Sequence, residues 1–226
     1  MHLDWFLGQI HPQQPGLWLL FSLVLAAGQW LSVRWLTPAL LPRVQVARWV
    51  LAPYLGLLLG GLSPRLLGLT DLDWLAGFGL GFGLVLVLWV LLILVRLTVD
   101  SAGAWSSGAG RVEARSLASL FIMAGAQEFH WVFLRGGVLE TLLTLPEPPP
   151  LANYWAIWIA TLFALLGVLF TRSSASQRFV SAFTLLMTSV LFFYARNFWL
   201  CWLLHASLRL LLAQEETSTS HLTRAS

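Results

Sequence analysis

The sequence predicts an all-α fold, a polytopic bundle of about seven transmembrane helices, and three observations predict it. Of the 226 residues, 58% are hydrophobic and only 10% are charged, whereas an ordinary soluble domain has about 25% charged residues. The mean hydropathy of the chain is +0.77. The chain also has 13 Trp and 14 Phe but 3 Tyr, and tryptophan favours membrane interfaces.

Seven stretches of the chain are apolar and long enough to cross a bilayer, which takes about 20 residues of helix. The predicted spans are 16–36, 44–62, 74–97, 117–145, 151–171, 178–195 and 197–213. We expect three N-terminal transmembrane helices within 16–97 and a four-helix region within 117–213. The segment 1–15 is polar, and the Ser-, Gly- and Ala-rich segment 98–116 is expected to be a cytoplasmic loop. The polar tail 214–226 is expected to be mobile.

The distribution of arginine predicts the orientation of the bundle. All 13 basic residues are Arg, and loops that face the cytoplasm are enriched in basic residues. Eight arginines lie in or beside the first, third and fifth connections: Arg34, Arg43, Arg48, Arg96, Arg111, Arg115, Arg172 and Arg178. Only Arg65 and Arg196 lie in the second and sixth. We therefore expect the N-terminus outside and the C-terminus in the cytoplasm, in a bacterial inner membrane. Because the arginines are scattered singly, no nucleic-acid partner is predicted.

Four glycines alternate near the start of the third predicted helix: Gly77, Gly79, Gly81 and Gly83. Small residues four apart allow two helices to approach closely inside a membrane. We predict that these glycines are helix-packing positions in two such sets. A dinucleotide-binding loop is not predicted, because no strand precedes the glycines.

Ionisable side chains within the predicted spans are candidates for a functional site, since a charge in the hydrocarbon costs roughly 2.5 to 3.5 kcal/mol. The fourth span contains Glu128, His130 and Arg135, and the seventh contains His205 and Arg209. Glu128 and Arg135 are two turns apart and share one helix face. The two spans run in opposite directions, so Glu128 and His205 are able to meet near mid-depth.

Two interpretations of these residues stay open. Glu128 either forms a buried salt bridge with Arg135 or Arg209, or acts as a general base that activates water. His205 is either a hydrogen-bonded core histidine or a catalytic or ligating group. His130 lies roughly 200° around the helix from Glu128, so the two cannot face one pocket without a distortion of the helix.

The order of three motifs in the C-terminal half resembles the CPBP family of intramembrane proteases, the CAAX-protease and bacteriocin-processing group also called Abi. That family carries Glu-Glu-x-x-x-Arg, usually followed by Gly, then Phe-x-x-x-His, then His-x-x-x-Asn or Asp on separate helices. Arg135 and Gly136 match the first motif, Phe163 matches the second, and His205 matches the third. The resemblance covers about 116–212 and implies an intramembrane protease fold.

Departures from the motifs bear on the activity that the resemblance implies. In register with Arg135, the two family glutamates fall on His130 and Trp131, the second-motif His falls on Gly167, and the third-motif Asn falls on Arg209. The family is thought to use the first glutamate and the histidines to activate water against a peptide bond, with the Asn helping to bind the oxyanion. A lone imidazole supplies neither the base pair nor the oxyanion donors.

Three functions are compatible with the sequence. The favoured one is a non-catalytic scaffold, assembly factor or accessory subunit of a membrane complex, whose partners are the lipid bilayer and other membrane proteins. The second is an active intramembrane endopeptidase with a rearranged centre of Glu128, His130 and His205, together with Arg135. The third is a membrane subunit that binds haem or chlorophyll through His130 or His205. No metal site and no required cofactor are predicted for the favoured function.

Overall fold

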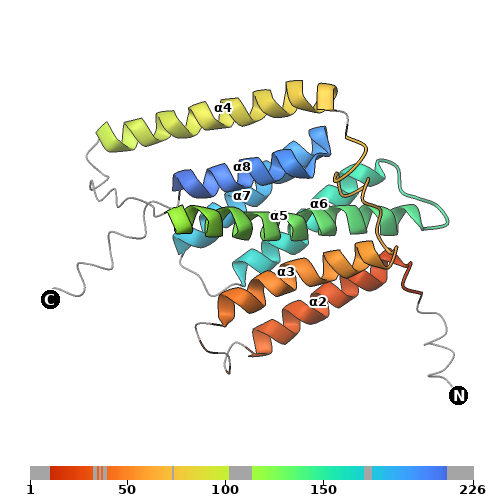
Figure 1. Cartoon of the computed structure of the whole chain (residues 1–226). Coiled ribbons are helices and arrows are strands. Elements are labelled where there is room, and N and C mark those ends of the chain that lie inside the picture. The colour runs from red at the N-terminus through yellow and green to blue at the C-terminus, as the bar shows by residue number, and fades with distance from the viewer. Residues whose placement is uncertain are drawn as a thin grey trace, which may run out of the picture.

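The computed structural model describes residues 11–32, 35, 37, 40–72, 74–101, 114–170 and 175–212. These residues form seven helices and no strand. Figure 1 shows how the helices are arranged. The helices are α2 (Pro15–Ser32), α3 (Leu41–Leu58), α4 (Trp74–Ser101), α5 (Ala114–Leu143), α6 (Ala152–Leu169), α7 (Ala175–Ala195) and α8 (Phe198–Leu212). Each predicted apolar stretch is helical, so the all-α prediction is confirmed for this part of the chain.

The helices on either side of the predicted central loop are longer than their apolar stretches. α4 continues to Ser101 and α5 begins at Ala114, so the expected loop 98–116 is wrong at both ends. A helix satisfies its own backbone hydrogen bonds, and its polar end can project beyond an apolar run without cost to the backbone. The middle of that loop, most of the polar segment 1–15 and the tail 214–226 lie outside the described residues.

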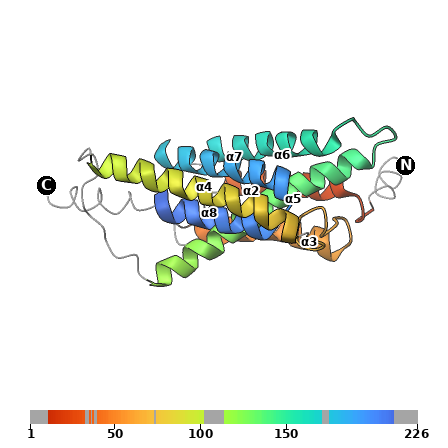
Figure 2. The same cartoon turned by 90° about the horizontal axis from the view of Figure 1, so that it is seen from above.

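α5 is the central helix of the bundle. It contacts α2, α3, α6 and α8, and Figures 1 and 2 show these helices around it. Val132 and Phe133, in its middle turns, have no exposed surface. Leu185 of α7 and Leu204 of α8 are also fully buried. Because neighbouring helices surround α5, the polar side chains in its middle turns lie away from the molecular surface.

The loop 59–72 closes one end of the bundle through hydrogen bonds to α5 and α8. Oε2 of Glu140 accepts a hydrogen bond from the backbone N–H of Ser63 at 3.0 Å. The carbonyl of Gly68 accepts one from the N–H of Phe198 at 3.0 Å. Glu140 is half-buried and joins the loop to α5.

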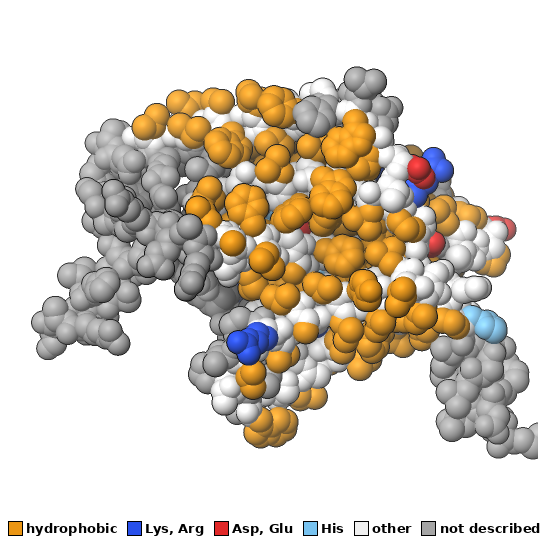
Figure 3. Space-filling view, in the orientation of Figure 1, with side chains coloured by type: hydrophobic (Ala, Val, Ile, Leu, Met, Phe, Trp, Pro, Cys, Tyr) orange, Lys and Arg blue, Asp and Glu red, His pale blue; other side chains and the backbone are white. Residues whose placement is uncertain are grey.

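The surface of the molecule supports a membrane location. Four helical segments are long and apolar enough to cross a membrane: Pro15–Ser32, Leu117–Leu143, Ala152–Leu169 and Gln177–Ala195. Shorter apolar helical stretches are Gly81–Leu91 and Phe198–Leu210. On the face in Figure 3, hydrophobic side chains cover the broad middle, and the charged side chains in view lie mainly toward the ends. A polar solvent would not favour such a surface, whereas lipid tails would.

The alternating glycines of α4 do not all pack against this chain. A Cβ at Gly81 would lie 2.7 Å from Cδ1 of Leu200, so Gly81 faces α8. A Cβ at Gly79 or Gly83 would meet no atom within 4 Å, and both residues are exposed. The prediction of close packing is therefore wrong for Gly79 and Gly83 within the described bundle, because residues two apart on a helix point to different sides. Gly77 lies in α4, outside the residues whose surroundings are described.

Candidate functional site

A cluster of three ionisable side chains lies in the centre of the bundle. Nη1 of Arg135 donates to Oε1 of Glu128 at 2.9 Å. Nδ1 of His205 lies 3.0 Å from Oε2 of the same carboxylate. Glu128 and His205 have no exposed surface, and Arg135 is only 1% exposed. The expected meeting of Glu128 with His205 is thus confirmed, and the salt-bridge partner of Glu128 is Arg135.

Local sequence explains how α5 builds this pair. Glu128 and Arg135 are seven residues apart on one continuous helix, which places them two turns apart on nearly the same face. The arginine side chain is long enough to cover that distance along the helix. α8 then supplies His205 from the opposite direction. Each oxygen of the Glu128 carboxylate therefore has its own partner.

Hydroxyl groups of α7 and α6 complete the cluster. Nη2 of Arg135 donates to Oγ1 of Thr188 and to Oγ of Ser189, both at 3.0 Å. Ser189 in turn lies 2.8 Å from Oγ1 of Thr161 on α6. The guanidinium carbon of Arg135 is also 5.4 Å from the centre of the Phe192 ring. These hydroxyls were not predicted from the sequence, although an adjacent Thr-Ser pair within an apolar helix is a signal that could have identified them.

Trp131 covers the cluster on the side of His205. Its ring stacks on the imidazole of His205 with centroids 4.8 Å apart and an angle of 18° between planes. Within the part of the chain that the structure describes, Nε2 of His205 has no hydrogen-bond partner. An imidazole with one nitrogen on a carboxylate and the other unpaired is the arrangement of a carboxylate-oriented base. Here, however, the aromatic ring and the helices enclose that base completely.

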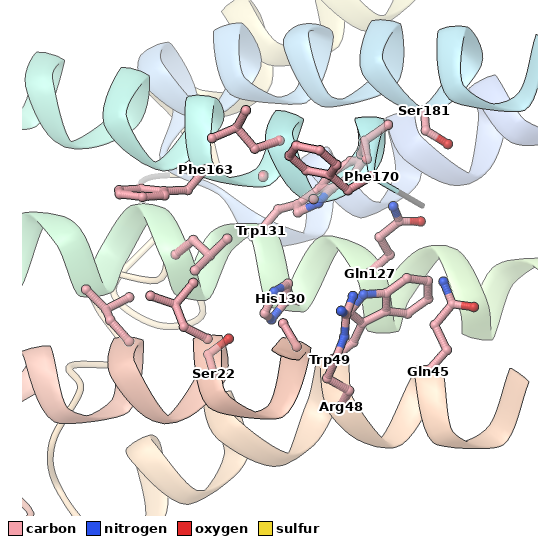
Figure 4. A pocket seen from close by; sticks show the side chains of 18 of the residues that line it. Ser22, Gln45, Arg48, Trp49, Gln127, His130, Trp131, Phe163, Phe170 and Ser181 are labelled. Carbon is pink, nitrogen blue, oxygen red and sulfur yellow. The ribbon is translucent and has the colours of Figure 1, made fainter. Parts of the chain in front are cut away.

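A separate cavity of about 920 Å³ lies on the other side of Trp131. Residues of α2, α3, α5, α6, α7 and α8 line it, and Figure 4 shows most of their side chains. Its polar and charged lining residues are Ser22, Gln45, Arg48, Gln127, His130, Gln177, Ser181 and Arg209. None of the described lining residues is Asp or Glu. The cavity is therefore basic, while the carboxylate of Glu128 lies outside it.

The residues that carry the CPBP-like motifs divide between the cavity and the cluster. His130, Trp131, Phe163, Gly167 and Arg209 all line the cavity. In the register expected from the resemblance, these positions correspond to the two glutamates, the phenylalanine, the second-motif histidine and the third-motif asparagine. Most positions of the expected motifs therefore lie at one cavity.

Gly136, which follows Arg135 in the first motif, lies against the loop 59–72. A Cβ at Gly136 would be 2.7 Å from Cδ1 of Leu67 and 3.3 Å from the carbonyl oxygen of Leu66. The role of this glycine is therefore to let the loop approach α5. It contributes no group to the cavity or to the cluster.

His130 does not join Glu128 and His205. It points from α5 toward α2 and α3, as Figure 4 shows, and its ring stacks on Phe133 with centroids 5.9 Å apart. A centre that contains Glu128, His130 and His205 together is therefore a wrong expectation for this geometry. The cause is the continuous helix, because the roughly 200° between positions 128 and 130 is preserved. The same separation prevents the two histidines from acting as paired axial ligands of one haem or chlorophyll.

Arg209 pairs with a neutral residue. Its Nη2 donates to Oε1 of Gln127, which places the guanidinium at the edge of the cavity. Arg209 forms no ion pair with any residue that the structure describes. The alternative in which Arg209 neutralises Glu128 is thus excluded by the geometry.

Comparison of the chain with protein-family models, with curated protein sequences and with solved structures found no significant match. Within the described residues, no three His, Cys, Asp or Glu side chains are grouped so that they could hold a metal ion. The site is therefore defined by its own geometry. That geometry has two parts, an enclosed ion cluster and a basic cavity.

Proposed function

We propose that this chain is an integral membrane protein with a CPBP-like arrangement that acts without peptide hydrolysis, as a scaffold, assembly factor or accessory subunit of a membrane complex. One observation carries the proposal. The cavity that gathers the motif positions holds His130, Trp131, Gly167 and Arg209, and its described lining contains no carboxylate. A peptide bond bound in this cavity would have no carboxylate base beside it to activate the attacking water.

The enclosed cluster supports the same conclusion. A general base has to reach the water that it activates, either directly or through one further water. Glu128 is instead bonded to Arg135 and His205, and it has no exposed surface. Trp131 stacks on His205 and lines the cavity, whereas Glu128 is not among the lining residues. We infer that the cluster fixes α5, α7 and α8 relative to one another.

We further propose seven spans, with the N-terminus outside and the C-terminus in the cytoplasm of a bacterial inner membrane. The four long apolar segments support four of these spans. α3, α4 and α8 would supply the other three, since each packs beside them in the bundle. The excess of arginine in the first, third and fifth connections supports the orientation.

The outer face of α4 is the surface that best fits a protein partner. α4 packs mainly on α7 and α8, and its large apolar side chains include Leu86, Val90 and Leu94, each about half exposed. Gly79 and Gly83 lie four apart and are open to the outside. A pair of small residues at this spacing allows the helix of another membrane protein to approach closely.

We expect the double substitution Gly79→Ile and Gly83→Ile to remove copurifying membrane subunits while the protein itself stays folded. Folding is retained because side chains at both positions would enter open space. The measurement is quantitative mass spectrometry of the wild-type and variant proteins, each purified from native membranes in mild detergent. Gly28→Ile is the matched control, since Gly28 is an exposed glycine of α2 that also meets nothing within 4 Å. An unchanged set of subunits in the double variant would contradict a partner surface on α4.

A second candidate is an active intramembrane endopeptidase that uses Glu128 and His205. The observation that favours it is the 3.0 Å contact between these side chains, together with the unpaired Nε2 of His205. This function needs a movement of Trp131 that admits water and a peptide. It predicts that Glu128→Gln or His205→Ala abolishes cleavage while the protein remains in the membrane.

A further inference from the structure

We propose that the basic cavity binds an anionic lipid, with the head group beside Arg48 and Arg209 and an acyl chain along the apolar inner wall. This assignment concerns the cavity alone. It requires neither proteolysis nor the proposed scaffold role.

The charge of the cavity selects an anion. Arg48 and Arg209 both line it, and neither forms an ion pair with any described residue. Nε of Arg48 and Nδ1 of His130 are buried polar atoms without a hydrogen-bond partner among the described residues. Two guanidinium groups at one concave site attract a phosphate group strongly, because arginine matches its oxygens with several N–H donors.

The shape of the cavity selects an amphiphile rather than a free anion. Figure 4 shows polar side chains such as Gln45 and Gln127 and apolar rings such as Phe163 and Phe170 around one cavity, so its lining is mixed. Leu19 and Val138 add to the apolar lining. A volume of about 920 Å³ is also larger than one phosphate group needs, since pockets for whole organic ligands span roughly 300 to 1,000 Å³.

The cavity is accessible from the side of the bundle. Leu20 and Phe170 belong to its lining and are 59% and 73% exposed, so the lining extends to well-exposed side chains. A lipid can therefore enter laterally between α2 and α6 without crossing an aqueous phase. Arg48 lies in the first half of α3 and Arg209 in the last turn of α8, and the proposed orientation puts both near the cytoplasmic leaflet, whose anionic lipids bind basic pockets of this kind.

The test is lipid binding by the full chain after purification in mild detergent and removal of loosely held lipid. Phosphatidylglycerol and phosphatidylcholine with identical acyl chains are added separately, and bound lipid is counted by native mass spectrometry. We expect the wild type to prefer phosphatidylglycerol, and Arg48→Gln with Arg209→Gln to reduce its binding roughly tenfold or more. The matched control is Arg43→Gln, because Arg43 is an exposed arginine of α3 outside the lining. Equal binding of the two lipids, or an equal loss in the control, overturns the proposal.

A second variant tests the acyl-chain part of the site without removing charge. A Cβ at Gly167 would meet no atom within 4 Å, and Gly167 lines the cavity. Gly167→Leu therefore extends a side chain into the cavity, and we expect it to reduce phosphatidylglycerol binding while the helical circular dichroism spectrum is retained. Full binding by this variant overturns the proposal. So does equal competition by inorganic phosphate, which would indicate an anion site, or a copurified peptide in place of the lipid.

Discussion

Glu128→Gln is expected to lower the free energy of unfolding by about 3 to 5 kcal/mol, because it leaves the buried charge of Arg135 without its counter-ion. The guanidinium would keep its hydrogen bonds to Thr188 and Ser189. Neither hydroxyl carries a negative charge, so the cost of burying the cation is not offset. Thermal unfolding in mild detergent, followed by circular dichroism, measures the change.

Two comparisons distinguish this charge effect from a general loss of packing. Glu140→Gln neutralises another carboxylate of α5, but its amide oxygen can still accept from the N–H of Ser63, so we expect a change below about 1 kcal/mol. The double variant Glu128→Gln with Arg135→Met removes both charges, and it should be more stable than Glu128→Gln alone. A single variant as stable as the wild type would contradict a structural ion pair.

Gly68→Ala is expected to destabilise the protein by roughly 2 to 5 kcal/mol, through backbone strain and overlap together. Gly68 has a φ of 66°, in the left-handed region. A Cβ there would overlap the carbonyl oxygen of Arg196. That oxygen is backbone, and the adjacent hydrogen bond from Phe198 to the Gly68 carbonyl fixes its position. The connection before α8 would have to move as a whole.

Gly60→Ala separates the two contributions to this effect. Gly60 lies in the same loop with a φ of 73°, but a Cβ there would meet nothing within 4 Å. Only the conformational cost of about 1 to 2 kcal/mol is then expected. The measurement is the midpoint of thermal unfolding of both variants beside the wild type. Equal destabilisation by both would show that the overlap of a Gly68 Cβ with Arg196 adds nothing to the conformational cost.

Hydropathy predicts the helices well, because each helix of this bundle carries a long run of apolar side chains. The meeting of Glu128 with Arg135 and His205 was also predictable. Two of these residues share a helix face by spacing alone, and the third lies on a helix of opposite direction. An unpaired charge in such an environment is costly, so residues of opposite charge at matching depth are expected to pair.

The rotation of each helix about its axis could not be predicted from the sequence. That rotation places Thr188 and Ser189 of α7 against Arg135, a contact that the hydropathy of the chain does not specify. It also turns Gly81 toward α8 and Gly79 away from it. The cavity was missed for the same reason, since its residues come from six helices and share no pattern along the chain.

The separation of cavity and cluster gives the two halves of the site different roles. Trp131 contacts both, because it lines the cavity and stacks on His205. The apolar ring of Trp131 supplies no base to the cavity, and Glu128 behind it has no exposed surface.

The central claim, that the protein acts without hydrolysing peptides, is tested most directly in proteoliposomes made with water labelled by heavy oxygen. Each hydrolysis then places the label in the new carboxyl group of a product peptide. A library of transmembrane peptides is incubated with the wild type and with His205→Asn, and the products are identified by mass spectrometry. We predict no labelled product in the wild type above the level of His205→Asn. Labelled products that disappear in a folded, membrane-inserted His205→Asn variant would contradict the claim.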